Sequence, residues 1–222
     1  PAAKVSSASV LRILNFRLLW LGEGISLLGD QFYLIALPWL VLSLTGNALM
    51  VGTVLATAGI PRALFMLVGG ALTDRFTPRK LMINSNLARM ILTGLLAVLV
   101  ATNLIQLWML YALALLFGLA DAFFFPAQTS IVPHLVDKDQ LQAGNALIQG
   151  TATLSVFVGP ALAGLLVSRL DGGATHSASG IALAVALDSI SFLASITALS
   201  LMKIERANTH AEKTQGGVLA SI

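Results

Sequence analysis

Six long apolar runs, separated by short polar links, fill most of this 222-residue sequence. A membrane-spanning helix needs about 20 largely apolar residues, and every one of these runs is long enough. Because a backbone in lipid must satisfy its own hydrogen bonds, such runs predict helices. The expected fold class is therefore an all-α integral membrane bundle of six transmembrane helices. The runs cover residues 18–44, 49–73, 81–101, 104–126, 143–168 and 179–202.

The composition supports a membrane protein and argues against other classes. Charged residues make up 10% of the chain, against about 25% in soluble domains, so a soluble fold would lack the charges to cover its surface. The net charge is +3, with most basic residues in the links. There they orient the helices in the bilayer, and no nucleic-acid partner is expected. Without cysteine, a disulfide framework or a cysteine metal site is excluded.

The basic residues also predict an orientation. Ten of them lie in links on one side, and only Arg169 lies on the other. Lysine and arginine are enriched in cytoplasmic loops, so we expect both ends of the chain to be cytoplasmic. The membrane itself is expected to be a plasma membrane, the inner membrane of a bacterium, which the charge pattern does not determine. The ten are Lys4, Arg12, Arg17, Arg75, Arg79, Lys80, Lys138, Lys203, Arg206 and Lys213.

The same pattern divides the chain. We expect a cytoplasmic N-terminus over residues 1–17, the bundle over 18–202, and the start of a central cytoplasmic loop over 203–222. Segment 127–142 mixes apolar and charged residues and is expected to lie at the cytoplasmic interface. The chain lacks an initial methionine and ends as a new apolar pattern begins, so we expect a fragment or the product of a truncated gene.

Ionisable residues inside the runs are the candidate functional residues. A charge at the bilayer centre costs about 2.5–3.5 kcal/mol if it is unpaired, so these groups are expected to pair or to line a cavity. One interpretation is a polar pathway for substrate or protons; the other is a set of salt bridges that holds the bundle together. The residues are Glu23, Asp30, Arg62, Arg89, Asp121 and Asp188.

Depth in the membrane suggests how these charges pair. At about 1.5 Å per residue, Asp30 and Arg62 both fall near the midplane and are expected to form a pair. Arg89 is expected between Glu23 and Asp121 in the cytoplasmic third. For the pathway we favour Asp30, Arg62 and Glu23, together with Asp188 near the middle of the sixth run.

The fifth run carries small residues at every fourth position, which places them on one helix face. Such a face favours close helix contact, and the proline within it removes one helix hydrogen bond. The interpretation is packing or, alternatively, a hinge or a seal for the cavity. The residues are Thr151, Ser155, Gly159 and Ala163, with Pro160.

Several chemistries lack support. The sequence contains no G-x-x-x-x-G-K-[ST] motif for ATP. Its three histidines lie in links on both sides, which argues against a metal cluster, and no Ser/His/Asp set converges. We therefore expect no enzyme activity, no metal and no cofactor.

The link between the second and third runs resembles the signature of the major facilitator superfamily at the same place. Thr77 stands where that signature usually has glycine, and Thr77-Pro78 makes the turn instead. The resemblance implies a cytoplasmic gate, with Asp121 as a partner of the loop arginine and Arg89 beside it. The matching residues are Gly70, Leu72, Asp74, Arg75, Arg79 and Lys80.

The fifth run is similar to the motif of facilitators that exchange drug for proton, through Gly159-Pro160 and Ala163-Gly164, with Ser155 in place of an early glycine. Gly29-Asp30, Pro61-Arg62 and Phe125-Pro126 resemble the branch that includes macrolide and enterobactin exporters.

This resemblance covers residues 10–206 and implies the N-terminal half of a twelve-helix fold. It implies secondary active, proton-coupled efflux of a small amphipathic molecule by alternating access, with a C-terminal half as partner. Alternatives from other classes are a non-transporting membrane scaffold and an inactive truncated half-transporter. Residues 28–33 also resemble 119–124, which suggests a three-plus-three inverted repeat of the kind found in secondary transporters.

Overall fold

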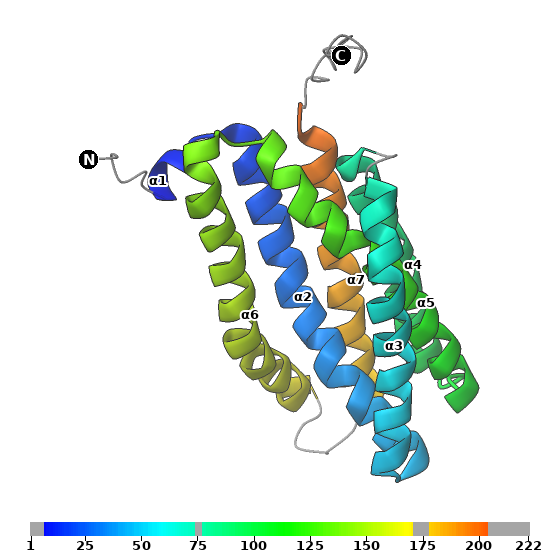
Figure 1. Cartoon of the computed structure of the whole chain (residues 1–222). Coiled ribbons are helices and arrows are strands. Elements are labelled where there is room, and N and C mark those ends of the chain that lie inside the picture. The colour runs from blue at the N-terminus through cyan, green and yellow to red at the C-terminus, as the bar shows by residue number, and fades with distance from the viewer. Residues whose placement is uncertain (1–6, 74–76, 171–177, 204–222) are drawn as a thin grey trace, which may run out of the picture.

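Six long helices run side by side in the computed structural model, which describes residues 7–73, 77–170 and 178–203 (Figure 1). Within those ranges, six helices are long and apolar enough to cross a membrane, as the sequence predicts. The bundle is formed by α2 (Leu14–Thr45), α3 (Ala48–Thr73), α4 (Pro78–Ala101), α5 (Leu107–Ile131), α6 (Leu141–Leu170) and α7 (Ala178–Leu201). The short α1 (Ser7–Val10) precedes them, and the 3₁₀ turns η1 (Val132–His134) and η2 (Lys138–Gln140) join α5 to α6.

Local sequence explains where the helices begin and end. The last turn of α2 is closed by Gly46, whose positive φ of 63° suits glycine and whose N–H donates to Leu42 O. Helix α4 begins with Pro78 in its first turn, where the missing N–H is not needed. Before α6, Asp137 and Gln140 form a reciprocal capping box. These signals keep the connections short, so successive helices run antiparallel.

The helices differ in how much of their surface is covered. Helix α7 packs along both α2 and α4, α3 packs against α5, and α6 lies mainly along α2. Large apolar side chains on α3 and α6 are left exposed; Leu64 on α3 is 64% exposed and Phe157 on α6 is 76% exposed. The outer faces of α3 and α6 are therefore apolar surfaces that no other described residue covers.

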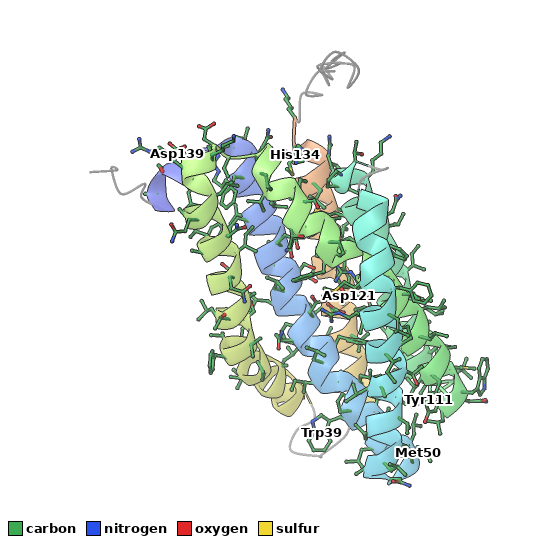
Figure 2. All side chains as sticks on the ribbon, in the orientation of Figure 1. Trp39, Met50, Tyr111, Asp121, His134 and Asp139 are labelled. Carbon is green, nitrogen blue, oxygen red and sulfur yellow. The ribbon has the colours of Figure 1, made fainter. Side chains whose placement is uncertain are left out.

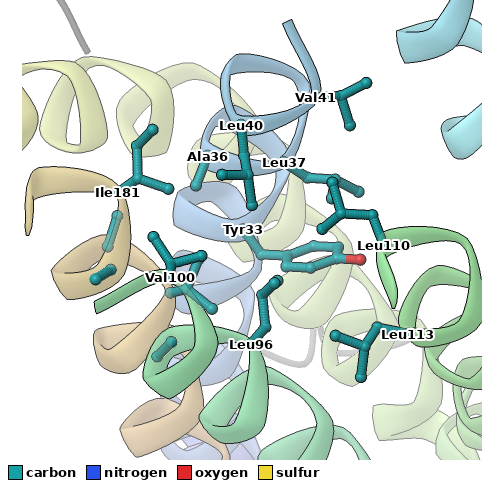
Figure 3. Close-up of a cluster of buried hydrophobic side chains, with 14 of the residues drawn as sticks. Tyr33, Ala36, Leu37, Leu40, Val41, Leu96, Val100, Leu110, Leu113 and Ile181 are labelled. Atoms are coloured by element: carbon teal, nitrogen blue, oxygen red, sulfur yellow. The ribbon is translucent and has the colours of Figure 1, made fainter. Parts of the chain in front are cut away.

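Two apolar clusters lie at different depths, with a polar layer between them. The first surrounds Tyr33, Leu37 and Leu110 near the end of the bundle where α2 turns into α3 (Figure 3). The second surrounds Phe16 and Met82 near the opposite end. The charged residues of the bundle thus lie between two apolar clusters.

Several helix boundaries differ from the sequence prediction, and two of the differences change where two charged residues lie along their helices. Helix α5 continues through Pro126 to Ile131, and α4 already begins at Pro78. Asp121 therefore lies ten residues from the end of α5, about 15 Å along the axis. Asp121 and Arg89 thus lie nearer the middle of their helices than the sequence analysis expected, because Pro126 lies inside α5 and does not end it, and α4 begins before residue 81.

Candidate functional site

Four helices meet in a cluster of ion pairs centred on Asp121, which lies about midway along the bundle (Figure 2). Its two carboxylate oxygens take different partners: Arg62 Nη1 lies 2.8 Å from Oδ2, and Arg89 Nη1 lies 3.1 Å from Oδ1. The same Arg89 nitrogen lies 3.9 Å from Asp30 Oδ2. The cluster thus joins α3, α4 and α5 directly and reaches α2 through Asp30.

The predicted pairing is corrected at two points. Arg62 pairs with Asp121 and not with Asp30. Arg89 does contact Asp121, but its second carboxylate is Asp30 and not Glu23. Depth alone could not give these partners, because the direction in which a side chain points turns by about 100° with each residue along a helix.

Arg89 is held in place by aromatic rings as well as by charge. Its side chain is 2% exposed, and its guanidinium carbon lies 4.1 Å from the centroid of Phe124 and 4.6 Å from that of Phe192. Arg89 also donates a hydrogen bond to Asn86 Oδ1. A guanidinium between two rings is attracted to both faces, and this fixes its donors toward the two aspartates.

A chain of buried hydrogen bonds extends from Arg89 toward Glu23. Asn86 Nδ2 donates to Ser195 Oγ at 2.8 Å, and Ser195 Oγ donates to Glu23 Oε1 at 2.8 Å. Gln128 Nε2 donates to Glu23 Oε2 at 3.1 Å. Glu23, which we expected in the substrate pathway, is only 3% exposed. It is therefore bonded to neutral donors within the bundle.

A pocket of about 290 Å³ opens beside the ion pairs, between α2, α3 and α5. One end is charged, with Asp30, Arg62 and Asp121, and the Arg62 side chain is half exposed there. The rest is apolar and includes Tyr33 and Phe117, whose rings stack with centroids 4.6 Å apart. An apolar wall with a few convergent polar groups is the usual make-up of a small-molecule site, and this one suits an amphipathic ligand.

Asp188 lies behind this pocket and not in its wall. It is completely buried on α7, against α2 at Gly29: a Cβ on Gly29 would lie 2.9 Å from Asp188 Oδ1. The sequence analysis placed Asp188 among the cavity residues, whereas in the structure it is separated from the pocket by α2.

The small face of α6 contacts α2, as its spacing suggests. Ser155, Gly159 and Ala163 are all buried, and Gly159 packs so closely on Gln31 that it has no room for a side chain. Gly164 faces open space, with nothing within 4 Å of a Cβ built there. Of the two interpretations of this face, packing is the one that these contacts support.

The structure describes only part of the charged motif between α3 and α4. Gly70 and Leu72 belong to the last turn of α3, while Asp74 and Arg75 lie outside the described residues. Arg79 reaches the end of α7, where its Nε donates to Leu199 O at 2.7 Å and its Nη2 to Ser200 O at 2.6 Å. Lys80 is exposed. Arg79 therefore caps the carbonyls of another helix.

Removing this cap is expected to loosen the end of α7. Arg79→Ala removes two charge-assisted bonds and a cation at a helix C-terminus, and we expect a loss of about 1 kcal/mol of stability because the site is partly exposed. Thermal unfolding of the purified protein in detergent measures this loss. Lys80→Ala is the matched control, and equal effects of the two substitutions would mean that the cap contributes nothing.

Sequence reasoning missed the residues that support the charges. Asn86, Gln128 and Ser195 carry a usable signal, because each is a polar side chain within or next to an apolar run. Phe192 and Phe117 carry no such signal, since phenylalanine is common on lipid-facing and buried surfaces alike.

Six helices long and apolar enough to cross a membrane, with a pocket between three of them, are the features of a multi-pass membrane protein. Residues 5–222 match the family described as "Transmembrane secretion effector", so the chain belongs to this family of the major facilitator superfamily, as the sequence motifs suggested.

Curated relatives agree with this assignment. Macrolide efflux protein A of Streptococcus pyogenes is 27% identical over 155 residues, which are 70% of this chain and 38% of that protein. The multidrug efflux pump Tap of Mycolicibacterium fortuitum is 28% identical over 185 residues, 81% of this chain and 43% of that protein. Tap of Mycobacterium tuberculosis is 28% identical over 198 residues, which are 85% of this chain and 44% of that protein. The chain thus spans less than half the length of these relatives.

Proposed function

We propose that this chain is the N-terminal half of an exporter of small amphipathic molecules, and that the pocket between α2, α3 and α5 forms part of its substrate site. The observation that carries the proposal is the combination of an apolar pocket with a charged end at mid-depth, the place where alternating-access transporters bind their substrates. The relatives' printed functions, macrolide and multidrug efflux, support the same class of substrate.

A second half is the proposed partner. The apolar outer faces of α3 and α6 are largely uncovered, and a second six-helix half packed on them would enclose the pocket and permit rocking of one half against the other. In this proposal the N-terminus and residues 203–222 are cytoplasmic, in a bacterial plasma membrane, and 203–222 begin the loop between the halves. The motif of Gly70, Asp74 and Arg75 then serves as a cytoplasmic gate.

Proton exchange is the proposed driving force. The chain carries no ATP-binding motif, and its pocket contains carboxylates that can take up and release protons. Arginine does not release its proton in proteins, so Asp30 and Asp121 are the candidates at the pocket surface. Active efflux should therefore stop when an uncoupler collapses the proton gradient.

Substitutions at two glycines of α3, Gly59 and Gly52, test whether the pocket binds substrate. Gly59 lines the pocket, and nothing lies within 4 Å of a Cβ built on it. Gly59→Leu should therefore fold normally yet fill the space, and we expect efflux of bulky substrates to fall by roughly tenfold or more. The measurement is whole-cell accumulation of macrolides and of amphipathic dyes, with and without an uncoupler, in cells that express the full-length protein.

Gly52→Leu is the matched control. Gly52 lies on the same helix and is equally open, but it does not line the pocket. If efflux is unchanged in both variants, this pocket is not part of the substrate site. Accumulation unaffected by the wild-type protein across the whole panel would contradict export itself.

A further inference from the structure

Asp188 occupies a closed position where α7 crosses α2. Its Oδ1 faces the backbone of Gly29, the residue immediately before Asp30 in the sequence. The hydroxyl of neighbouring Ser191 donates to the backbone carbonyl of Asp188 at 2.7 Å and makes no hydrogen bond to its carboxyl group. The site therefore lies next to the chain neighbour of the pocket residue Asp30, but Asp188 itself does not line the pocket.

The carboxyl group of Asp188 makes neither a hydrogen bond nor an ion pair with any described residue. Among the described residues, neither Oδ1 nor Oδ2 receives a hydrogen bond, and the residue is 0% exposed. Asp30 Oδ1 is likewise buried without a partner. Burying an isolated ionised carboxylate costs far more than burying a neutral acid, and such groups neutralise instead.

The surrounding charges do not change this conclusion. From α2, Asp30 and Tyr33 face the group; from α4, Arg89 does so; and Asp121 lies beyond Arg89 on α5. The side chains described on α6, residues 141–166, include no ionisable group. Both nearby arginines pair with other carboxylates, since Arg62 pairs with Asp121 and Arg89 is shared between Asp121 and Asp30, while Arg89 Nε makes no hydrogen bond. Asp30, Asp121 and Asp188 thus outnumber these two cations by one, and the buried Glu23, which lies within electrostatic reach of Arg89 and Asp30, adds a further carboxyl group.

We propose that Asp188 is a proton-binding site, and that its proton reaches it from the pocket through Asp30. The proton binds first to Asp30, whose side chain lines the pocket and whose buried Oδ1 lacks a partner. It then passes to a carboxylate oxygen of Asp188, and Asp30 returns to the carboxylate beside Arg89. The ligand is a proton, and Asp188 is its buried carrier.

This inference deepens the proposed exchange mechanism, and only the coupling role rests on that function. Proton occupancy of Asp188 is a property of the folded bundle and is measurable without any transport. If the protein shows no efflux, the proposal that Asp188 binds a proton is unaffected. If Asp188 binds no proton, efflux can still be driven by protons at the pocket aspartates.

Infrared spectroscopy of the purified protein in lipid tests the proposal directly. A protonated aspartic acid in an apolar site gives a carboxylic acid C=O band that a carboxylate lacks, and labelling of aspartate with carbon-13 shifts that band. We expect the labelled band at neutral pH in the wild-type protein and in Asp121→Asn, and its loss in Asp188→Asn. A band that persists in Asp188→Asn overturns the assignment.

A stability measurement gives a second readout. Asparagine resembles the neutral acid, so Asp188→Asn should fold as well as the wild-type protein at neutral pH. Raising the pH removes the proton and leaves a buried charge, so the melting temperature of the wild-type protein should fall at alkaline pH while that of Asp188→Asn falls less. If Asp188→Asn is the less stable protein at every pH, or does not fold, Asp188 is an ionised partner and the proposal is wrong. The absence of a labelled band in the wild-type protein would overturn the proposal even if Asp188→Asn could not be purified.

Discussion

Replacing Arg89 with methionine is expected to destabilise the bundle more than any other single change to its charges. The substitution leaves Asp121 with only its half-exposed partner Arg62, leaves Asp30 without a cation, and removes the donor to Asn86. Breaking a buried ion pair by removing one partner costs about 3–5 kcal/mol. The yield of folded protein in detergent and its thermal unfolding measure the effect.

Two further variants separate the causes. Arg89→Lys keeps the charge but loses the planar fork and the stacking on Phe124 and Phe192, so an intermediate loss is expected. Arg62→Met removes the other partner of Asp121, but Arg62 is half exposed, and we expect a loss of about 1 kcal/mol or less. If Arg89→Met is no worse than Arg62→Met, Arg89 does not hold the bundle together.

The fold could be predicted from the sequence because lipid leaves few alternatives. A run such as 179–202 without a charge other than Asp188 can only be satisfied as a helix, and α7 spans Ala178–Leu201. The boundaries were less certain where local signals compete. Pro126 followed by polar residues looks like a helix end, yet the helix continues to Ile131, and Thr129 bonds back to the carbonyl of Pro126 at 2.9 Å.

The candidate site was predictable in its residues but not in its contacts. A charge in an apolar run is conspicuous, and so Asp30, Arg62, Arg89 and Asp121 could be identified at once. Their pairing depends on how each helix is rotated about its axis, and six-helix packing sets that rotation through small apolar contacts. The aromatic sandwich around Arg89 is of this kind, because Phe192 resembles every other phenylalanine in the sequence.

The two similar segments in α2 and α5 meet at one side chain. Asp30 and Asp121, which occupy corresponding positions in them, lie on either side of the same Arg89 nitrogen, at 3.9 and 3.1 Å. An inverted repeat would place its corresponding residues symmetrically about the centre of the bundle. Arg89 is a single cation for which two carboxylates compete, although Asp121 also has Arg62, so neutralising one of the two should strengthen the bond of Arg89 to the other.

Gly118→Val is expected to abolish transport by displacing α3. Gly118 on α5 touches the backbone of α3 directly: a Cβ there would lie 2.9 Å from the carbonyl carbon and the Cα of Ala58, and closer still to its oxygen. Backbone atoms cannot rotate away as a side chain can, so the helices must separate. Overpacking of this kind costs about 1–3 kcal/mol.

The separation acts on the pocket because Arg62 lies one turn along α3 from Ala58. Moving that turn outward lengthens the 2.8 Å contact between Arg62 and Asp121 and removes the cation from the charged end of the pocket. Helix α3 is held mainly by α5, so the rest of the bundle should still assemble. We therefore expect a protein that is made in normal amount and located in the membrane, but with efflux reduced to background.

Cross-linking can show the displacement itself. The natural chain contains no cysteine, so the pair Thr53→Cys and Tyr111→Cys, whose native hydroxyl oxygens lie 2.6 Å apart on α3 and α5, can be joined selectively. Gly118→Val should lower the yield of a short bifunctional cross-link between them. Gly150→Val, at an open position on α6, controls for placing a β-branched residue within a helix. Equal cross-linking and equal efflux in the two valine variants would mean that the contact between Gly118 and Ala58 does not position α3.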